Sequence, residues 1–294
     1  MIYVIQTLVD AVSVGAVYAL SALGIGLLFG VMRLVNFAQG EFVTIGIYTL
    51  MLTVGLWFPL AAILTVLVVV LLALLADRLA FKPVRDADPA TMLITSFALS
   101  YLLQNVLVLI FGARPIGFNI IPELGLPVMI GEIRIPRLNI LTICVAVGLL
   151  TGIALFLRRT RIGIEMRAAA VDFRMARLLG IKGDRVIAVA FALTGVLSAV
   201  VAVLFAAQTG TAAPTYGLQL ALVGFVATVI GGMGSLVGAV FGGMIVGVVT
   251  VCLQALLPPE LRVFREAFVY AVVIAILVLR PDGLFQGVGS RERV

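Results

Sequence analysis

The sequence predicts an all-α integral membrane protein, a polytopic bundle of about eight or nine transmembrane helices, and three observations support this. Hydrophobic residues make up 63% of the 294 residues. Charged residues make up only 12%, whereas soluble domains keep about a quarter of their residues charged. Apolar runs of about 20 residues, enough to cross a hydrocarbon core of about 30 Å, recur along the chain. We therefore predict one transmembrane domain over residues 1–294.

Nine apolar runs are candidates for the spans. They are residues 8–31, 42–58, 60–75, 91–111, 138–157, 186–207, 220–230, 236–257 and 264–279. Glycines in the first run provide small faces for close helix packing in lipid. Trp57 and Phe58 resemble an interfacial belt at the end of the second run. The segment 112–138 contains four prolines and is too broken to cross lipid, and two prolines at 258 and 259 stop the eighth run.

Composition also excludes several functional classes. The chain has no histidine, which removes the usual proton shuttle and the commonest metal ligand. Cys144 and Cys252 lie in apolar runs without metal-site or disulfide spacing. The chain has no Gly-x-x-x-x-Gly-Lys-Ser/Thr motif, so we expect no ATP site, no metal and no catalytic residue in it. The net charge of +6 lies in loops and tails and does not predict nucleic-acid binding.

A polar segment, residues 158–185, separates the fifth and sixth runs and holds eight of the 20 Lys and Arg residues. Its residues 164–179 predict one helix with two unlike faces. The apolar face consists of Ile164, Ala168, Val171, Met175 and Leu178. Gly180 is expected to stop this helix, with Ile181 folding back over its last turn. A membrane protein that builds such a helix outside lipid presents it to a partner, and the alternative is that its basic face rests on anionic lipid headgroups.

The distribution of basic residues predicts the orientation. If residues 158–185 are cytoplasmic, alternating spans place the loop 77–89 and the C-terminal tail on the same side. Together with Arg33, these segments hold 15 of the 20 Lys and Arg residues. Because cytoplasmic loops carry an excess of Lys and Arg, we expect a cytoplasmic C-terminus and an extracytoplasmic N-terminus.

The first candidate site is the polar break at residues 36–41, which contains Asn36, Gln39, Gly40 and Glu41. A carboxylate within or beside a span usually faces a cavity or a partner. Gly40 allows a helix break at membrane depth, where the N-terminus of the following half-helix would face an anionic ligand. We predict that these residues line a substrate pathway. The alternative is an ordinary turn, in which Asn36 caps a helix and Arg33 pairs with Glu41.

The fourth run supplies three further pathway candidates, Thr95, Ser96 and Gln104. The hydroxyls of Thr and Ser can return to the helix backbone, so these two residues can also be simple filler. The amide of Gln104 needs a partner in a dry setting and is harder to explain in this way.

Glycines near the C-terminal end supply the last pathway candidates, Gly232, Gly234 and Ser235, which precede a run with Gly-x-x-x-Gly spacing. Residues 232–244 faintly resemble residues 36–48, because each places a glycine-bearing break before a glycine-spaced apolar run. Such breaks in two halves of a chain mark the binding region of transporters. Close helix packing is the alternative explanation.

Three motifs, in order along nearly the whole chain, carry a family resemblance. They are VNFAQGE at residues 35–41 with Gly46-Ile47-Tyr48, RAAAVD at residues 167–172 followed by Ala176 and Leu179-Gly180-Ile181, and GGMGS at residues 231–235 with Gly238 and Gly242-Gly243. Together they resemble the LivH-type permeases of branched-chain amino acid ABC transporters. One departure is Val171, where many members carry an acidic or amide residue, and this weakens any salt-bridge prediction there.

The resemblance implies the ABC importer permease type of fold, with residues 158–185 as a cytoplasmic segment that couples to ATPases. The residues expected in this coupling are Ile164, Arg167, Ala168, Asp172, Ala176, Leu179 and Gly180. It also implies a second homologous permease chain, two cytoplasmic ATPases that bind the ATP, and an extracytoplasmic substrate-binding protein. The chain would lie in the plasma membrane of a bacterium or archaeon, in contact with lipid.

The substrate implied by the resemblance is leucine, isoleucine or valine. Some relatives of this family handle urea, short amides or other amino acids, so these alternatives stay open. A different class, a self-contained channel or secondary transporter, would need acids in the spans that couple ions, and such acids are scarce here.

Overall fold

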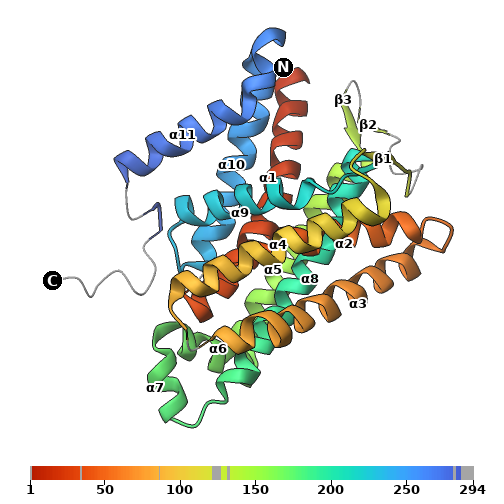
Figure 1. Ribbon diagram of the computed structural model, residues 1–294. Helices are drawn as coiled ribbons and strands as arrows, with labels where there is room; N and C mark the ends of the chain where they lie inside the picture. Colours follow the sequence, from red (N-terminus) through yellow and green to blue (C-terminus); the bar gives the residue numbers. More distant parts are fainter. Residues whose placement is uncertain are drawn as a thin grey trace.

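The computed structural model describes residues 2–33, 35–85, 87–120, 127–130, 133–280 and 283–285 (Figure 1). Six helices in these ranges are long and apolar enough to cross a membrane. They are α1 (Ile2–Met32), α3 (Phe58–Ala76), α4 (Pro89–Phe111), α5 (Arg137–Arg159), α8 (Gly183–Thr209) and α10 (Leu236–Leu256). A π-helical turn, η1 (Asp77–Phe81), and a 3₁₀ turn, η2 (Lys82–Val84), extend α3.

Three other apolar helices are shorter: α2 (Ala38–Leu52), α9 (Tyr216–Gly231) and α11 (Arg265–Leu279). At 1.5 Å per residue each extends only about 23 Å, less than a hydrocarbon core of about 30 Å. The chain is therefore a polytopic helical membrane protein, and the number of eight or nine crossings stays a prediction. Each of the nine predicted apolar runs overlaps mainly one helix, but the ends differ by up to six residues, and Phe58, predicted to end the second run, is the first residue of α3.

Two small antiparallel sheets order the connections at one end of the bundle. Strand β1 (Ile116–Gly117) pairs with β4 (Thr211–Ala212), and β2 (Pro127–Ile130) pairs with β3 (Ile133–Pro136). An all-α fold does not include these strands. They form because backbone groups in the loops need hydrogen-bond partners where helices end. We call this end, with the start of α1 and the 3₁₀ turn η4 (Pro259–Phe264), the hairpin end.

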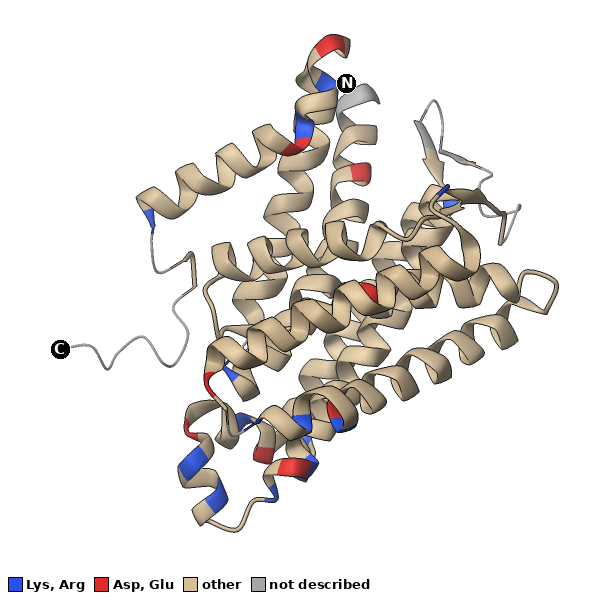
Figure 2. Ribbon diagram, in the orientation of Figure 1, with Lys and Arg blue, Asp and Glu red and all other residues tan. Residues whose placement is uncertain are grey.

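The opposite end carries most of the charge, and we call it the basic end. It consists of Arg33, η1 and η2, and the two helices α6 (Arg161–Val171) and α7 (Phe173–Leu178). Figure 2 shows Lys and Arg gathered around these elements. Arg85 forms ion pairs with Asp77 and, at 2.8 Å, with Asp184, and so ties the end of α3 to the start of α8.

The packing of the helices has the pattern of an inverted repeat. Helix α1 packs along α10, and α8 packs in the same way along α3. The short helix α2 lies against α8, and the short helix α9 lies against α1. Helices α1–α4 thus correspond to α8–α11 with opposite direction, an arrangement found in many transporters. Glycines allow the closest approaches, as at Gly247, which faces the backbone of Gly15.

Leu284 and Phe285, which follow α11 in the chain, bind to the end of α9. The backbone N–H of Leu284 donates to the carbonyl of Ile230 (2.8 Å), and that of Phe285 donates to Gly231 (3.0 Å). The ring of Phe285 stacks on Phe241 of α10, with 5.2 Å between ring centroids. These bonds satisfy carbonyls that the end of a helix leaves without partners.

Candidate functional site

Helix α2 begins inside the bundle rather than at its end. The side-chain amide of Gln39 donates to the backbone carbonyl of Ser21 (3.2 Å), which lies 11 residues before Met32, the last residue of α1. That distance along α1 corresponds to about 16 Å, or half of a hydrocarbon core. Residues 35–37 therefore precede a helix that starts beside residues 21–24 of α1. A helix that starts inside the bundle was predicted, but α2 begins at Ala38, so Gly40 lies within it, and its depth in the membrane stays a prediction.

Helix α9 begins at the same depth and runs in the opposite direction. Gly40 in the first turn of α2 faces Gly217 in the first turn of α9, and a Cβ atom at Gly40 would overlap the carbonyl oxygen of Gly217. Helix α9 then crosses α1, with the hydroxyl of Ser21 donating to Leu220 (3.3 Å) and that of Thr228 to Ala22 (3.0 Å). The N-termini of two half-helices thus meet in the middle of the bundle.

Three polar side chains from the predicted pathway lie at this junction. Asn36, Gln39 and Glu41 are exposed by 1%, 2% and 0%, respectively. Asn36 Nδ2, Gln39 Oε1 and Glu41 Oε2 have no hydrogen-bond partner among the described residues. The other oxygen of Glu41 accepts from the hydroxyl of Ser100 on α4 (3.4 Å). Buried polar atoms without partners are costly, so such a group of them marks a candidate binding site.

The alternative prediction for residues 36–41, an ordinary turn, is wrong in one part. Arg33 does not pair with Glu41, because its guanidinium donates to the carbonyl of Ala170 in α6 (3.0 Å). The other part is only partly correct, since Asn36 accepts from the backbone N–H of Ala38 (3.0 Å) but lies one residue before Phe37, the N-cap residue of α2. The N–H of Gly40 also has a partner, the carbonyl of Phe37 (3.3 Å). An anion at the start of α2 would therefore have to displace these local bonds.

Aromatic rings cover the junction on the side of α4. Phe37 stacks on Phe97 with 4.2 Å between centroids, and Phe225 of α9 lies 5.6 Å from Phe37. These rings bring α4 and α9 together over the start of α2. Asn36, Gln39 and Glu41 are almost completely buried, so the junction is closed in this structure.

The three pathway candidates on α4 differ in their burial and in their hydrogen bonds. Thr95 returns its hydroxyl to Thr91 (2.8 Å) and Ser96 returns its own to Leu93 (2.8 Å), as expected for filler residues in a membrane helix. Ser96 is nevertheless fully buried, and its hydroxyl lies 3.5 Å from the carbonyl of Val35, beside the junction. Gln104 is half-buried on the same helix.

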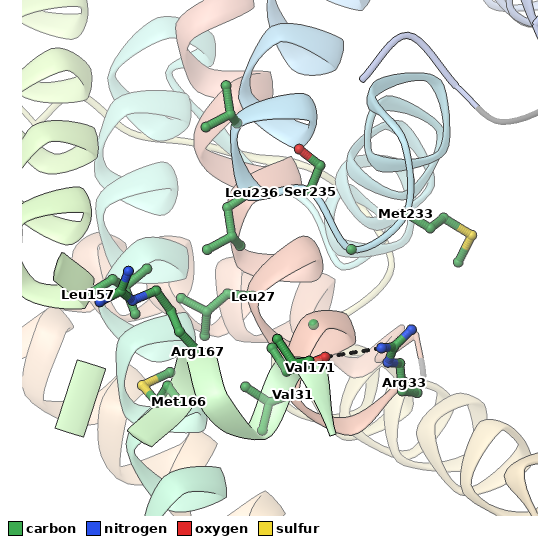
Figure 3. Close-up of a pocket in the computed structure, with 14 residues that line it drawn as sticks. Leu27, Val31, Arg33, Leu157, Met166, Arg167, Val171, Met233, Ser235 and Leu236 are labelled. Carbon is green, nitrogen blue, oxygen red and sulfur yellow. Dashed lines mark hydrogen bonds between the residues drawn. The ribbon is translucent and has the colours of Figure 1, made fainter. Parts of the chain in front are cut away.

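The glycine candidates lie elsewhere, at the basic end, in the turn between α9 and α10. Gly232 and Gly234 both have positive φ (102° and 92°), which explains why the turn requires glycine. Ser235 caps α10 by accepting from the N–H of Gly238 (3.0 Å). Gly234 and Ser235 line a cavity of about 450 Å³ together with Arg33, Arg167 and apolar residues of α1 and α6 (Figure 3).

The counterpart of the Gly40 break is therefore not the one expected from the sequence. The comparison of residues 36–48 with residues 232–244 is wrong, because Gly217, not Gly232, meets Gly40. The glycines that follow Gly232 serve close packing: Gly238 faces the backbone of Gly231, and a side chain there would collide with it. The sequence signal for Gly217 is a glycine next to Pro214 and Tyr216, just before a short apolar run.

The coupling segment contains two helices where the sequence predicted one. The chain leaves helical geometry at Asp172 (φ −147°), whose carboxylate caps α7 by accepting from the N–H of Met175 (2.9 Å). The single helix over residues 164–179 is thus a wrong prediction. Gly180 ends α7 as predicted, with φ of 89° and a bond from the N–H of Ile181 to the carbonyl of Ala176 (3.1 Å).

The side chains predicted to form the apolar face of this segment are exposed on the surface of the protein. Large exposed fractions are found for Ile164 (52%), Val171 (63%), Met175 (54%), Leu178 (74%) and Leu179 (79%). Arg167, Ala168 and Asp172 are exposed as well, whereas Ala176 is buried and holds α7 to the bundle. Contiguous apolar side chains on a surface outside lipid mark an interaction site.

Comparisons with known proteins agree with this architecture. Residues 7–278 match the family model described as branched-chain amino acid transport system / permease component. The chain is 31% identical to the high-affinity branched-chain amino acid transport system permease protein LivH of Salmonella typhimurium, over 96% of each chain. It is 32% identical to the corresponding protein BraD of Pseudomonas aeruginosa, over 95% of each chain.

More distant similarity reaches other transporters. The galactofuranose transporter permease protein YtfT of Escherichia coli is 31% identical over 51% of this chain and 47% of its own length. No solved structure matches the chain. Because the family model covers almost the whole chain and two full-length relatives exceed 30% identity, the chain belongs to the permease component family of branched-chain amino acid transport systems and is a permease subunit of an ABC importer.

Proposed function

We propose that this chain forms part of the pathway of an ATP-driven importer for branched-chain amino acids, with α6 and α7 docked on a cytoplasmic ATPase. The basic end is then cytoplasmic, which agrees with the excess of Lys and Arg there. The N-terminus lies on the extracytoplasmic side. Residues 286–294, which the orientation prediction places in the cytoplasm, lie outside the described residues.

The observation that carries this proposal is the exposed apolar face of α6 and α7. Met175 and Leu178 project from a segment that carries several arginines and lies outside the apolar bundle, so they are not lipid contacts. A groove on an ATPase would bury them. When the two ATPases bind ATP and close on each other, they would then move α6 and α7. The Thr160 cap and Gly163 hold α6 tightly against the end of α5. The ATP is bound by the partner subunits, and this chain carries no cofactor of its own.

The test replaces the apolar face in the assembled transporter. The double variant Met175→Ser, Leu178→Ser should reach the membrane in normal amount, because both side chains are exposed, but should lose ATP-dependent uptake and retain little ATPase on purification. The matched control is Arg174→Ser, an exposed change on the same short helix. Normal uptake and normal ATPase retention in the double variant would reject the docking surface.

For the substrate, we infer that the junction of α2 and α9 binds the amino acid during transport. A zwitterion needs donors for its carboxylate and acceptors for its ammonium group. The unpartnered Asn36 Nδ2 is a donor, and the unpartnered Gln39 Oε1 and Glu41 Oε2 are acceptors. Because the junction is closed, access requires α2 and α9 to separate at Gly40 and Gly217.

Glu41→Gln tests this site with a panel of labelled substrates in vesicles that contain the whole transporter. A hydrogen bond to a charged group contributes about 1.5–3 kcal/mol, so uptake of leucine should require a concentration at least about tenfold higher. Glu165→Gln, outside the bundle on α6, is the control. Urea and short amides lack both charges, and if they are the true substrates their uptake should not depend on the charge of Glu41. Unchanged leucine uptake by the variant would refute the assignment.

A further inference from the structure

A groove between α1, α5 and α10 near the basic end combines an apolar wall with two arginines. Its volume is about 310 Å³, and α5 contributes Leu150, Ile153, Ala154 and Leu157 to it. The charged residues in its lining are Arg158 at the end of α5 and Arg167 of α6. No acidic residue lines this groove.

The groove continues into the cavity of about 450 Å³ beneath the turn between α9 and α10. The two spaces share Leu157, Arg167, Leu236 and Val237. The larger cavity is lined mainly by apolar side chains, with Arg33 and Arg167 on opposite sides of it (Figure 3). It also lacks an acidic lining residue, so the whole space suits an elongated molecule with an apolar part and a negative charge.

The arginines of the groove are free to bind such a molecule. Neither Arg158 nor Arg167 forms an ion pair within the part of the chain that the structure describes. Both are exposed, and a guanidinium group matches the geometry of a phosphate through paired N–H donors. Arg167 was expected to contact an ATPase, but it faces this space.

The position of the groove identifies the source of the negative charge. Val147 and Leu155 of α5, the helix that forms one wall of the groove, are exposed by 57% and 50%, as expected for residues that contact acyl chains. The arginines lie where α5 leaves the apolar bundle, at the level of lipid headgroups. Basic pockets between transmembrane helices at this level suit anionic headgroups. We propose that the groove between α1, α5 and α10 binds one anionic phospholipid, with an acyl chain along the apolar wall and the phosphate at Arg158 and Arg167.

Bound there, the lipid would join the end of α5, the start of α10 and helix α6. It would contact the coupling segment at Arg167 of α6, whereas Met175 and Leu178, which are proposed to dock on the ATPase, belong to α7. The proposal needs only the groove and its charges, so it stands or falls independently of the docking on an ATPase and of the substrate.

Native mass spectrometry of the purified transporter tests it, with phosphatidylglycerol and phosphatidylcholine of identical acyl chains. Phosphatidylglycerol should be retained preferentially. Each arginine near a headgroup contributes about 1 kcal/mol, so Arg158→Gln should lower this preference about fivefold. The matched control is Arg159→Gln, the adjacent exposed arginine, which does not line the groove. Ala154→Phe narrows the apolar wall and should reduce retention of both lipids.

Four results would overturn the proposal or its assignment of the phosphate. The first is equal retention of the two lipids by the unchanged protein. The second is competition by glycerol 3-phosphate, which would indicate a site for free phosphate. The third is a cross-link from Ala154→Cys to a second permease chain, which would show that protein covers the groove. Equal losses in Arg158→Gln and Arg159→Gln would likewise reject the assignment of the phosphate.

Discussion

Replacing Gly40 by alanine tests whether the contact between the two half-helices supports the fold and the pathway. A Cβ atom at Gly40 would overlap the carbonyl oxygen of Gly217 and lie 2.6 Å from its carbonyl carbon and 2.8 Å from Cβ of Ala221. Ordinary contacts of a Cβ atom begin at 3.4 Å. Two of the three nearest atoms belong to backbone, so α2 and α9 must separate by roughly 1 Å, since packed interiors have little free space.

Overpacking of this kind costs about 1–3 kcal/mol. In a chain of this size each kcal/mol lowers Tm by roughly 2–4 °C, which fluorescence-detected thermal unfolding of the purified protein measures. Uptake should fall as well, because Asn36, Gln39 and Glu41 lie at the displaced junction. The reciprocal variant Gly217→Ala should behave alike, since its Cβ atom would lie 2.6 Å from the carbonyl oxygen of Gly40.

Gly148→Ala is the matched control, because Gly148 is also a glycine within a membrane helix but no atom lies within 4 Å of a Cβ atom there. This control should retain the Tm and the uptake of the unchanged chain. If Gly40→Ala behaved like Gly148→Ala in both measurements, the close contact of α2 with α9 would not exist in the membrane, and the description of the junction would fail.

Three further predictions concern the basic end. Arg85→Met leaves the carboxylate of Asp77, which is only 8% exposed, without its partner. The free energy of chemical unfolding should fall by about 3 kcal/mol, and the second substitution Asp77→Asn should restore part of this loss. Gly180→Ala places a side chain at φ 89° and should cost about 1 kcal/mol, visible as faster hydrogen exchange in α7 but not in α10. Ser235→Ala removes the cap of α10 and should lower the free energy of unfolding by about 1 kcal/mol, whereas Ser235→Thr should retain most of it.

The apolar helices were predictable because hydropathy and proline positions mark them directly. Pro258 and Pro259 end α10 within one residue of the expected place, and Pro89 begins α4. The depth of α2 was predictable only as a possibility, because a turn and a half-helix start share the residues Asn36 and Gly40. Whether these residues form a turn or a half-helix start depends on the hydrogen bond from Gln39 to Ser21, a tertiary contact that hydropathy does not report.

Other features required the structure for equally physical reasons. The helical spacing of Met175 and Leu178 with Ile164 continues through Asp172, so the break there leaves no trace in the periodicity. Gly217 was not predicted as a site residue, because many glycines in this chain serve packing. Its role depends on the tertiary contact with Gly40. The partnership of Ser100 with Glu41 joins residues 59 apart in sequence and could not be distinguished from filler.

The bonds from Leu284 and Phe285 to the end of α9 have a consequence for how the chain is made. During synthesis, α9 enters the membrane well before these residues leave the ribosome, and the carbonyls of Ile230 and Gly231 lack these donors until then. Open carbonyls at the end of a membrane helix favour water over lipid. The end of α9 therefore remains in contact with water until α11 has inserted, so the assembly of the second half-helix is completed by a segment more than fifty residues downstream.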